Sequence, residues 1–277
     1  MSTQAVVVTG ASTGIGAATV ELLAERGFTV FAGVRSEADF ARVAARAPRI
    51  RPLYLDVTDA DAVARAAHDV AQSGLALRGV VANAGIAAGG PLEFLPVSEL
   101  RRVLETNVIG AVAVTQAFLP QLRTTHGRVV LVGSISGRVA FPFMGPYAAS
   151  KFALRAISDA LRLELTPAGI AVALIEPGSV KTPIWAKGRA SRDRLMTMLG
   201  PTALEYYGEK IDAIIRATEH EERTGMPAER VSAAILHALT ARRPRSRYLL
   251  GPQARAAGVI ALFPSAVRDR VFGSTLK

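Results

Sequence analysis

The sequence predicts an α/β fold with a single domain, in which helices cover both faces of a parallel sheet of about seven strands. Short β-branched apolar runs alternate along the chain with longer stretches of helical periodicity. Several of these runs, such as Val6–Val8, are apolar throughout, which is typical of strands that are covered on both faces. No linker or internal repeat interrupts the 277 residues, so one doubly wound domain over residues 1–277 is the simplest assembly.

The elements follow from these patterns in chain order. A β-α-β unit is predicted from the run Ala5–Thr9, the helical pattern Ile15–Arg26 and the run Thr29–Val34. Five further strands are expected at Pro52–Val57, Val80–Ala82, Arg128–Val132, Ile170–Ile175 and Arg247–Leu250. Helices are expected over Ser98–Leu122, from Tyr147 to about Thr166, and from near Pro227. Residues 185–225 contain no strand and are expected to form a helical insertion that covers the substrate as a lid; its alternative is a set of helices that only cover the core.

Composition excludes several classes of protein. Half of the residues are hydrophobic and 20% are charged, which excludes a disordered chain. The absence of Cys removes disulfide scaffolds, thiolate nucleophiles and Cys-based zinc sites. The four His residues show no ligand spacing, so no metal is expected. The first residues lack the pattern of a secretory signal, and no apolar run approaches the length of a membrane span, so a cytoplasmic protein is expected.

Positive charge is concentrated in the last third of the chain. The net charge is +10, and residues 185–277 hold 16 basic against 9 acidic residues. Because aromatic residues are not interleaved with these basic residues, nucleic acid is not expected as a partner. An alternative role for this region is contact with an anionic membrane surface, through Arg242–Arg245 and the apolar run Val259–Phe263.

Distinctive polar and glycine residues follow six of the predicted strands. The carboxyl ends of parallel strands lie at one edge of a sheet, where ligands of open α/β sheets bind, so we expect one common site. Gly10, Gly14 and Gly16 follow the first strand and allow a tight turn, and the next helix N-terminus can bind a pyrophosphate. Arg35 follows the second strand, where a guanidinium can pair with a 2′-phosphate, so NADP(H) is favoured over NAD(H). The alternative is a solvated loop arginine.

Tyr147 and Lys151 are candidates for acid–base chemistry. They are four residues apart on a predicted helix, so their side chains share a face. Bringing the phenol pKa toward neutrality requires roughly 4 kcal/mol, and an ammonium about 4 Å away supplies a comparable amount at an effective dielectric constant near 20. Ser134 ends the fifth strand and can hydrogen-bond a carbonyl oxygen, with Ser136 as the competing candidate. Ile135 stands where a serine hydrolase motif would require its nucleophile, which disfavours that class.

Asn107 lies on the apolar stripe of a predicted helix and therefore needs hydrogen-bond partners. An unsatisfied buried amide costs roughly 1 to 3 kcal/mol. One interpretation is a core asparagine that bonds a neighbouring carbonyl. The other is a bend in the helix that orders a water molecule leading to Lys151.

Together these residues resemble the motifs of the short-chain dehydrogenase/reductase family in order and spacing. The matching segments are TGASTGIG at 9–16, NAG at 83–85, Asn107, Ser134, Tyr147-x-x-x-Lys151 and Pro177-Gly178, and the resemblance covers residues 4 to 184. It implies a Rossmann fold in which Tyr147 is the general acid/base and Ser134 polarises the carbonyl. It further implies that Lys151 lowers the Tyr147 pKa and bonds the nicotinamide ribose, and that Asn107 supports a proton relay.

The resemblance also completes the set of cofactor-binding residues. Asp56 and Val57 would flank the adenine, and Thr182 would meet the nicotinamide carboxamide. The expected dinucleotide-binding residues are Gly10, Ser12, Thr13, Gly14, Ile15, Gly16, Arg35, Asp56, Val57, Asn83, Ala84, Gly85, Tyr147, Lys151, Pro177, Gly178, Val180 and Thr182.

The later part of the chain is similar to the hydroxysteroid and retinol dehydrogenase branch, through Val34-Arg35 and the segments 238–240 and 244–251. This implies an oxidoreductase for a secondary alcohol, ketone or aldehyde on a bulky, steroid-like or retinoid-like substrate, and a homo-dimer or homo-tetramer. The expected pocket walls are Phe141, Phe143, Met144, Trp185, Met196, Met198, Leu199, Tyr206 and Tyr207, with ordinary core packing as their alternative. The alternative functions are a β-ketoacyl thioester reductase and a regulator that senses NADPH without turnover.

Overall fold

A single parallel sheet of seven strands forms the centre of the protein. The computed structural model describes residues 4–184 and 192–273. The strands are β1 (Gln4–Val8), β2 (Thr29–Val34), β3 (Ile50–Tyr54), β4 (Ala76–Ala82), β5 (Arg128–Val132), β6 (Ala171–Pro177) and β7 (Arg247–Leu250), in the spatial order β3-β2-β1-β4-β5-β6-β7. The chain therefore reverses direction across the sheet between β1 and β4, which is where open α/β sheets bind their ligands.

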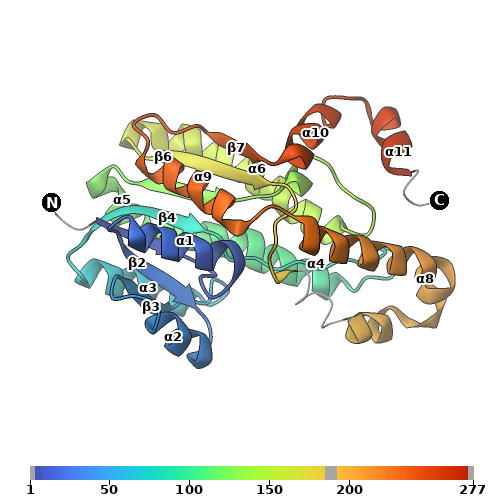
Figure 1. Ribbon diagram of the computed structural model, residues 1–277, viewed down its shortest axis with the longest axis horizontal. Coiled ribbons are helices and arrows are strands. Elements are labelled where there is room, and N and C mark those ends of the chain that lie inside the picture. Colours follow the sequence, from blue (N-terminus) through green and yellow to red (C-terminus); the bar gives the residue numbers. More distant parts are fainter. Residues whose placement is uncertain (1–3, 185–191, 274–277) are drawn as a thin grey trace.

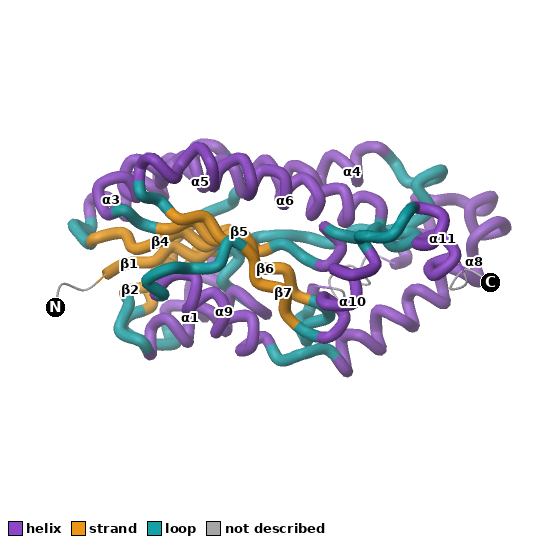
Figure 2. Tube along the Cα trace, turned by 90° about the horizontal axis from the view of Figure 1, so that it is seen from above, coloured by secondary structure: helices purple, strands orange, loops and turns teal. Residues whose placement is uncertain are grey.

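Helices cover both faces of this sheet. They are α1 (Gly14–Glu25), α2 (Glu37–Ala44), α3 (Ala60–Gln72), α4 (Val97–Leu104), α5 (Gly110–Thr125), α6 (Gly145–Leu165), α8 (Arg192–Thr224), α9 (Ala228–Thr240), α10 (Pro252–Ile260) and α11 (Ser265–Gly273). Figure 1 shows α1 and α9 in front of the sheet, and Figure 2 shows α3, α5 and α6 on the opposite side. Helix α8 extends beyond the sheet, and α10 and α11 lie near the C-terminus (Figure 1).

Two hydrophobic cores lie on the two faces because side chains alternate along each strand. In β1, Val6 and Val8 belong to the core beneath α1 and α9. Ala5 and Val7 belong to the core beneath α3, α5 and α6, together with the fully buried Phe118 of α5. These layers confirm the predicted doubly wound α/β fold in one domain.

The largest differences from the predicted strand boundaries are in the third and fourth strands. The third strand runs over Ile50–Tyr54 instead of 52–57, because Asp56 starts a turn in which its carboxylate accepts hydrogen bonds from Thr58. The fourth strand begins at Ala76, four residues earlier than predicted, because it pairs along the whole of β1. The charged and turn-forming residues that border an apolar run therefore predict the ends of a strand only approximately.

The predicted helix Ser98–Leu122 is interrupted in the structure. A π-helical turn, Glu105–Ile109, joins α4 to α5 and contains Asn107. By length and composition Val97–Thr125 is apolar enough to cross a membrane, which is weak evidence because a core helix passes the same test. Since α5 packs on β4 and buries Phe118, the apolar face of this helix forms part of the protein core.

The insertion between β6 and α9 is helical in its described part. Helix α8 is broken at Gly200, which has a φ of +76° and precedes Pro201. Proline disfavours helical geometry in the residue before it, so the break has a local cause. The predicted lid over 185–225 includes residues 185–191, among them Trp185, which lie outside the described residues.

Candidate active site

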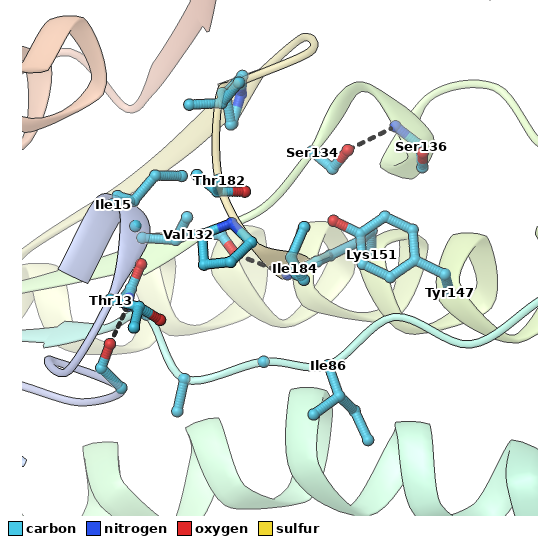
Figure 3. A pocket seen from close by; sticks show the side chains of 18 of the residues that line it. Thr13, Ile15, Ile86, Val132, Ser134, Ser136, Tyr147, Lys151, Thr182 and Ile184 are labelled. Carbon is cyan, nitrogen blue, oxygen red and sulfur yellow. Dashed lines mark hydrogen bonds between the residues drawn. The ribbon is translucent and has the colours of Figure 1, made fainter. Parts of the chain in front are cut away.

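A cavity of about 520 Å³ lies at the carboxyl edge of the sheet. Its walls come from the segments that follow the first six strands, and from α6 and α8. All the expected catalytic and dinucleotide-binding residues line this cavity, except Gly16, Asp56 and Asn107. Figure 3 shows one part of it, with Thr13 and Ile15 at one end and Ser134, Tyr147 and Lys151 at the other.

The glycine loop after β1 is folded for close contact with a ligand. Gly10 and Gly14 have φ values of +62° and +58°, a region that favours glycine. Gly16 does not line the cavity; a Cβ on it would lie 2.1 Å from the Gly10 carbonyl oxygen. Its role is therefore to let the loop pack directly against the start of α1. That helix has no acidic residue in its first turn, so its N-terminus favours an anion.

Hydrogen bonds of Asn83 and Thr9 fix the start of this glycine loop to the end of β4. The Asn83 side-chain amide donates to the carbonyl oxygens of Thr9 at 2.9 Å and Gly10 at 3.2 Å. In return, the buried Thr9 hydroxyl accepts from the backbone N–H groups of Asn83 and Ala84, at 3.0 and 2.9 Å. The end of β4 is thereby fixed against the end of β1, at the switch point of the sheet.

The residues expected to contact the adenosine part of the cofactor lie in different places relative to the cavity. Arg35 and Ser12 both line the cavity, and the Arg35 side chain is exposed. Asp56 does not line it, because its carboxylate is engaged by Thr58 in the turn after β3; Val57 does line it. The role of Asp56 beside the adenine therefore stays a prediction.

Ser134, Tyr147 and Lys151 meet at the other end. Ser134 follows β5, and its hydroxyl accepts a hydrogen bond from the Ser136 N–H at 3.1 Å. Tyr147 and Lys151 lie in the first two turns of α6, and both are buried. The Lys151 ammonium donates to the Val132 carbonyl at 2.9 Å and lies 5.5 Å from the centre of the Tyr147 ring.

Burial controls the protonation of this pair. It raises the pKa of Tyr147 to about 12, although a hydrogen bond with Ser134 acts in the opposite direction. Burial also lowers the pKa of Lys151 to about 8. Burial is therefore the largest influence on the Tyr147 pKa, and the lowering of that pKa by Lys151 stays a prediction.

Asn107 supports the site without lining it. Its carboxamide oxygen accepts from the Ile86 N–H at 2.8 Å, and its NH₂ group donates to the Ile86 carbonyl at 2.9 Å. The same NH₂ group donates to the Ser150 hydroxyl at 3.0 Å. The π-helical turn thus places Asn107 between the segment after β4 and α6, and Ile86 itself lines the cavity.

The apolar wall is only partly the one predicted from the sequence. Phe141 and Met144 line the cavity and pack around Tyr147 together with Ile184. Phe143, Met198, Leu199, Tyr206 and Tyr207 do not line it. Leu199 and Tyr207 instead belong to a separate small core, and the Tyr207 ring contacts Phe143 edge to face. Trp185 lies outside the described residues, and the Met196 side chain is likewise not described.

The sequence analysis missed the part of α8 that does line the cavity. These residues are Ala213, Ile214, Ala217, Thr218 and Glu221. Their spacing places them on one face of the helix. That periodicity was visible in the sequence, whereas the large aromatic and Met side chains that drew attention lie in the preceding part of the insertion. Among the described residues, no group of three or more His, Asp or Glu side chains could hold a metal ion.

Comparison with known sequences finds dehydrogenases and reductases of one family. A family model described as short chain dehydrogenase matches residues 4–193. An NADPH-dependent 3-dehydrocapnine reductase of Ornithobacterium rhinotracheale is 35% identical over 98% of this chain and 96% of its own length. Human retinol dehydrogenase 16 is 35% identical over 90% of this chain and 81% of its own length.

Solved structures agree with the fold and carry both kinds of dinucleotide. A short chain dehydrogenase from Burkholderia cenocepacia J2315 in complex with NADP has a TM-score of 0.75 and 28% identity, and covers 98% of each chain. A short chain dehydrogenase/reductase from Burkholderia phymatum in complex with NAD has a TM-score of 0.79 and 26% identity, with coverage of 93% and 92%.

Proposed function

The chain belongs to the short-chain dehydrogenase/reductase family, and we propose that it is an NADPH-preferring enzyme that interconverts a ketone and a secondary alcohol on a bulky lipophilic substrate. One observation carries the proposal. The buried Tyr147 lies in the same cavity as the glycine loop and is surrounded by apolar side chains, those of Phe141, Met144 and Ile184.

The residues around the glycine loop fit the pyrophosphate of a dinucleotide cofactor. Gly10 and Gly14 line the cavity without a side chain, so backbone is what a pyrophosphate would approach there, and Gly16 lets this loop pack on α1. Thr182 contacts this loop from the other side, since a Cβ on Gly14 would lie 3.1 Å from its methyl group. We infer that Thr13, Ile15 and Val180 complete this part of the cofactor site, and that the bound nicotinamide supplies or accepts the hydride.

Tyr147, Ser134 and Lys151 provide and position the proton that the reduction of a ketone requires. With a pKa of about 12, Tyr147 holds its hydroxyl proton at neutral pH and is ready to donate it to an alkoxide that develops on the substrate. The Ser134 hydroxyl lies beside it and can donate to the same oxygen. Lys151 is fixed by the Val132 carbonyl, so its ammonium remains near the phenol ring. Burial of Tyr147 and Lys151 keeps water from competing for that proton.

The substrate end supports a lipophilic molecule. Its described lining includes Ile86, Pro142, Met144, Ile184 and Ile214. Pockets lined in this way, with a few convergent polar groups, bind apolar ligands and orient them through the polar groups. The names of the relatives include a retinol dehydrogenase and a reductase of 3-dehydrocapnine, which supports a ketone or alcohol on a large substrate.

NADPH consumption with a panel of ketosteroids, retinal, aryl ketones and acetoacetyl thioesters tests this function. We expect turnover of the bulky ketones. Ile214→Asn, which places an amide on the lining face of α8, is expected to raise KM for them by about tenfold, roughly 1.4 kcal/mol of lost apolar contact. Leu204→Asn on the same helix is the control, because Leu204 does not line the cavity. Preference for the thioester would instead support acyl reduction, and NADPH binding without any turnover would support a sensor.

The cofactor preference rests on Arg35. We expect Arg35→Ser to raise KM for NADPH by about 10- to 100-fold and to leave KM for NADH nearly unchanged, because a charged hydrogen bond to a 2′-phosphate contributes roughly 1.5 to 3 kcal/mol. Arg26→Ser removes the same charge from the end of α1, away from the cavity, and serves as the control. Equal use of NADH and NADPH by the unchanged enzyme would contradict the assignment of Arg35.

A further inference from the structure

A buried ion pair joins two segments that line the active-site cavity. The Arg138 guanidinium donates from Nε to Glu176 Oε1 at 2.9 Å and from Nη2 to Oε2 at 2.6 Å. The exposed fractions of the two side chains are 12% and 1%. Neither residue lines the cavity, and the proposed reaction uses neither. The pair therefore needs an explanation outside direct contact with substrate or cofactor.

Arg138 is connected to Ser134 through a short, fully hydrogen-bonded turn. Ile135–Gly137 form a 3₁₀ turn (η2), and the Ser134 hydroxyl caps it by accepting from the Ser136 N–H (Figure 3). The Gly137 N–H donates to the Ser134 carbonyl at 3.0 Å, and the Arg138 N–H donates to the Ile135 carbonyl at 2.8 Å. A shift of Arg138 would consequently be transmitted to the Ser134 hydroxyl.

Glu176 lies in β6, the strand that leads to the other wall of the site. It directly precedes Pro177, the last residue of β6, and Gly178, which both line the cavity. The Gly133 N–H, just before Ser134, donates to the Ile175 carbonyl at 2.7 Å. One backbone hydrogen bond and one bidentate ion pair therefore attach the two ends of the Ser134 segment to consecutive residues of β6.

The same turn is pressed against the lysine of the site. A Cβ on Gly137 would lie 2.6 Å from the Lys151 carbonyl oxygen and 3.0 Å from its carbon, so the turn packs directly on α6. Movement toward α6 is blocked by this contact, and movement away from β6 is resisted by the ion pair. Ser134 is thus held in a fixed place relative to the start of α6, which carries Tyr147.

Stability alone does not account for such a pair. Exchanging both members of a buried ion pair for apolar residues of similar volume is often neutral or stabilising. A bidentate guanidinium–carboxylate contact differs from an apolar contact because it fixes both a distance and an orientation. We propose that the Arg138–Glu176 ion pair positions the Ser134 turn for the reaction, an inference that rests on the proposed ketone reduction and concerns positioning residues that do not touch the substrate.

The double variant Arg138→Met with Glu176→Met tests this inference. It removes both charges, so no lone buried charge remains to unfold the protein. We expect kcat for ketone reduction to fall by about 100-fold, the effect of roughly 1 Å of misplacement, while KM, NADPH affinity and Tm stay close to those of the unchanged enzyme. The control exchanges Glu99 and Arg102 on α4, an ion pair in which Arg102 is half exposed, for Met, with no expected effect on kcat. An unchanged kcat in the Arg138 and Glu176 variant would overturn the inference.

Amide hydrogen exchange gives a readout that needs no substrate. We expect faster exchange in residues 134–139 of the double variant and unchanged exchange in β1 and α1. Arg138→Lys keeps the charge but not the two-pronged contact, so it should fold even where the double variant does not, and it should show a smaller change in the same direction. Failure of the unchanged enzyme to reduce any ketone would refute the proposed function, whereas unchanged exchange at 134–139 would refute the positioning role.

Discussion

Replacement of Tyr147 with phenylalanine is expected to lower kcat for ketone reduction by about 10²- to 10⁴-fold, the contribution of a positioned general acid. The change removes one hydroxyl group and keeps the ring, which packs with Ala87 and Met144. NADPH affinity should therefore change little. Reduction rates under saturating NADPH, together with a fluorescence titration of NADPH binding, measure both quantities.

Tyr207→Phe is the matched control for that experiment. Tyr207 also carries a hydroxyl group, which donates to Glu93 at 2.9 Å, but it lies outside the cavity. Its loss should leave kcat within about twofold, since only a surface hydrogen bond is removed. A Tyr147→Phe enzyme that retains most of its kcat would contradict the role of Tyr147 as the acid.

The same variant has a predictable effect on stability as a function of pH. The pKa of Tyr147 is about 12 in the folded protein and lies near 10 in an unfolded chain. The folded state therefore holds the proton more tightly, so this contribution to the free energy of unfolding is complete below pH 10 and is lost as the pH rises toward 12. The stability of the unchanged protein relative to Tyr147→Phe should fall in this window, as measured by urea unfolding.

The sheet could be predicted from the sequence because its signal is local and repeated. Each of the seven strands contains an apolar run, and the polar or glycine residues after six of them lie at one edge for a topological reason. The end of the third strand was predicted wrongly, since only the hydrogen bonds of Asp56 to Thr58 show that a turn begins there. Strand existence thus follows from composition, whereas strand ends depend on individual side-chain contacts.

The walls of the substrate pocket could not be predicted from residue type. Aromatic and Met side chains of the insertion were the natural candidates, yet Leu199 and Tyr207 form a small core of their own with Leu95 and Phe94. The break at Gly200 and the packing of α8 decide which face meets the cavity. Small residues such as Ala213 and Ala217 line it because a helix with short side chains leaves room for a ligand.

The Tyr147 pKa shows a second limit of sequence reasoning. Coulomb attraction depends on a spacing that the sequence reveals, because residues four apart on a helix are neighbours. The free energy of dehydration depends on burial, which only the assembled fold reveals. Since Tyr147 is buried, loss of hydration is the largest influence on its pKa, which lies above the usual value.

A single methyl group at Gly16 is expected to weaken NADPH binding by about 100-fold or more. In Gly16→Ala the new Cβ would lie 2.1 Å from the Gly10 carbonyl oxygen and 2.7 Å from the Asn83 amide nitrogen, both parts of the loop scaffold. Adding one methyl group to a packed site costs roughly 1 to 3 kcal/mol, and a contact with rigid backbone belongs at the upper end. The start of α1 must then move away from the loop, which separates the helix N-terminus from the position of the pyrophosphate.

Gly208→Ala separates this effect from a general response to alanine in a helix. A Cβ at Gly208, in α8, would meet no atom within 4 Å, so NADPH affinity and Tm should remain unchanged or rise slightly. Titration of NADPH fluorescence against both variants makes the comparison. Undiminished NADPH binding by Gly16→Ala would mean that the dinucleotide does not depend on close packing of this loop, and the cofactor site would have to be sought elsewhere in the cavity. A loss confined to Gly16→Ala would tie cofactor binding to the contact between the β1 loop and α1, because the two variants add the same group and differ only in what that group meets.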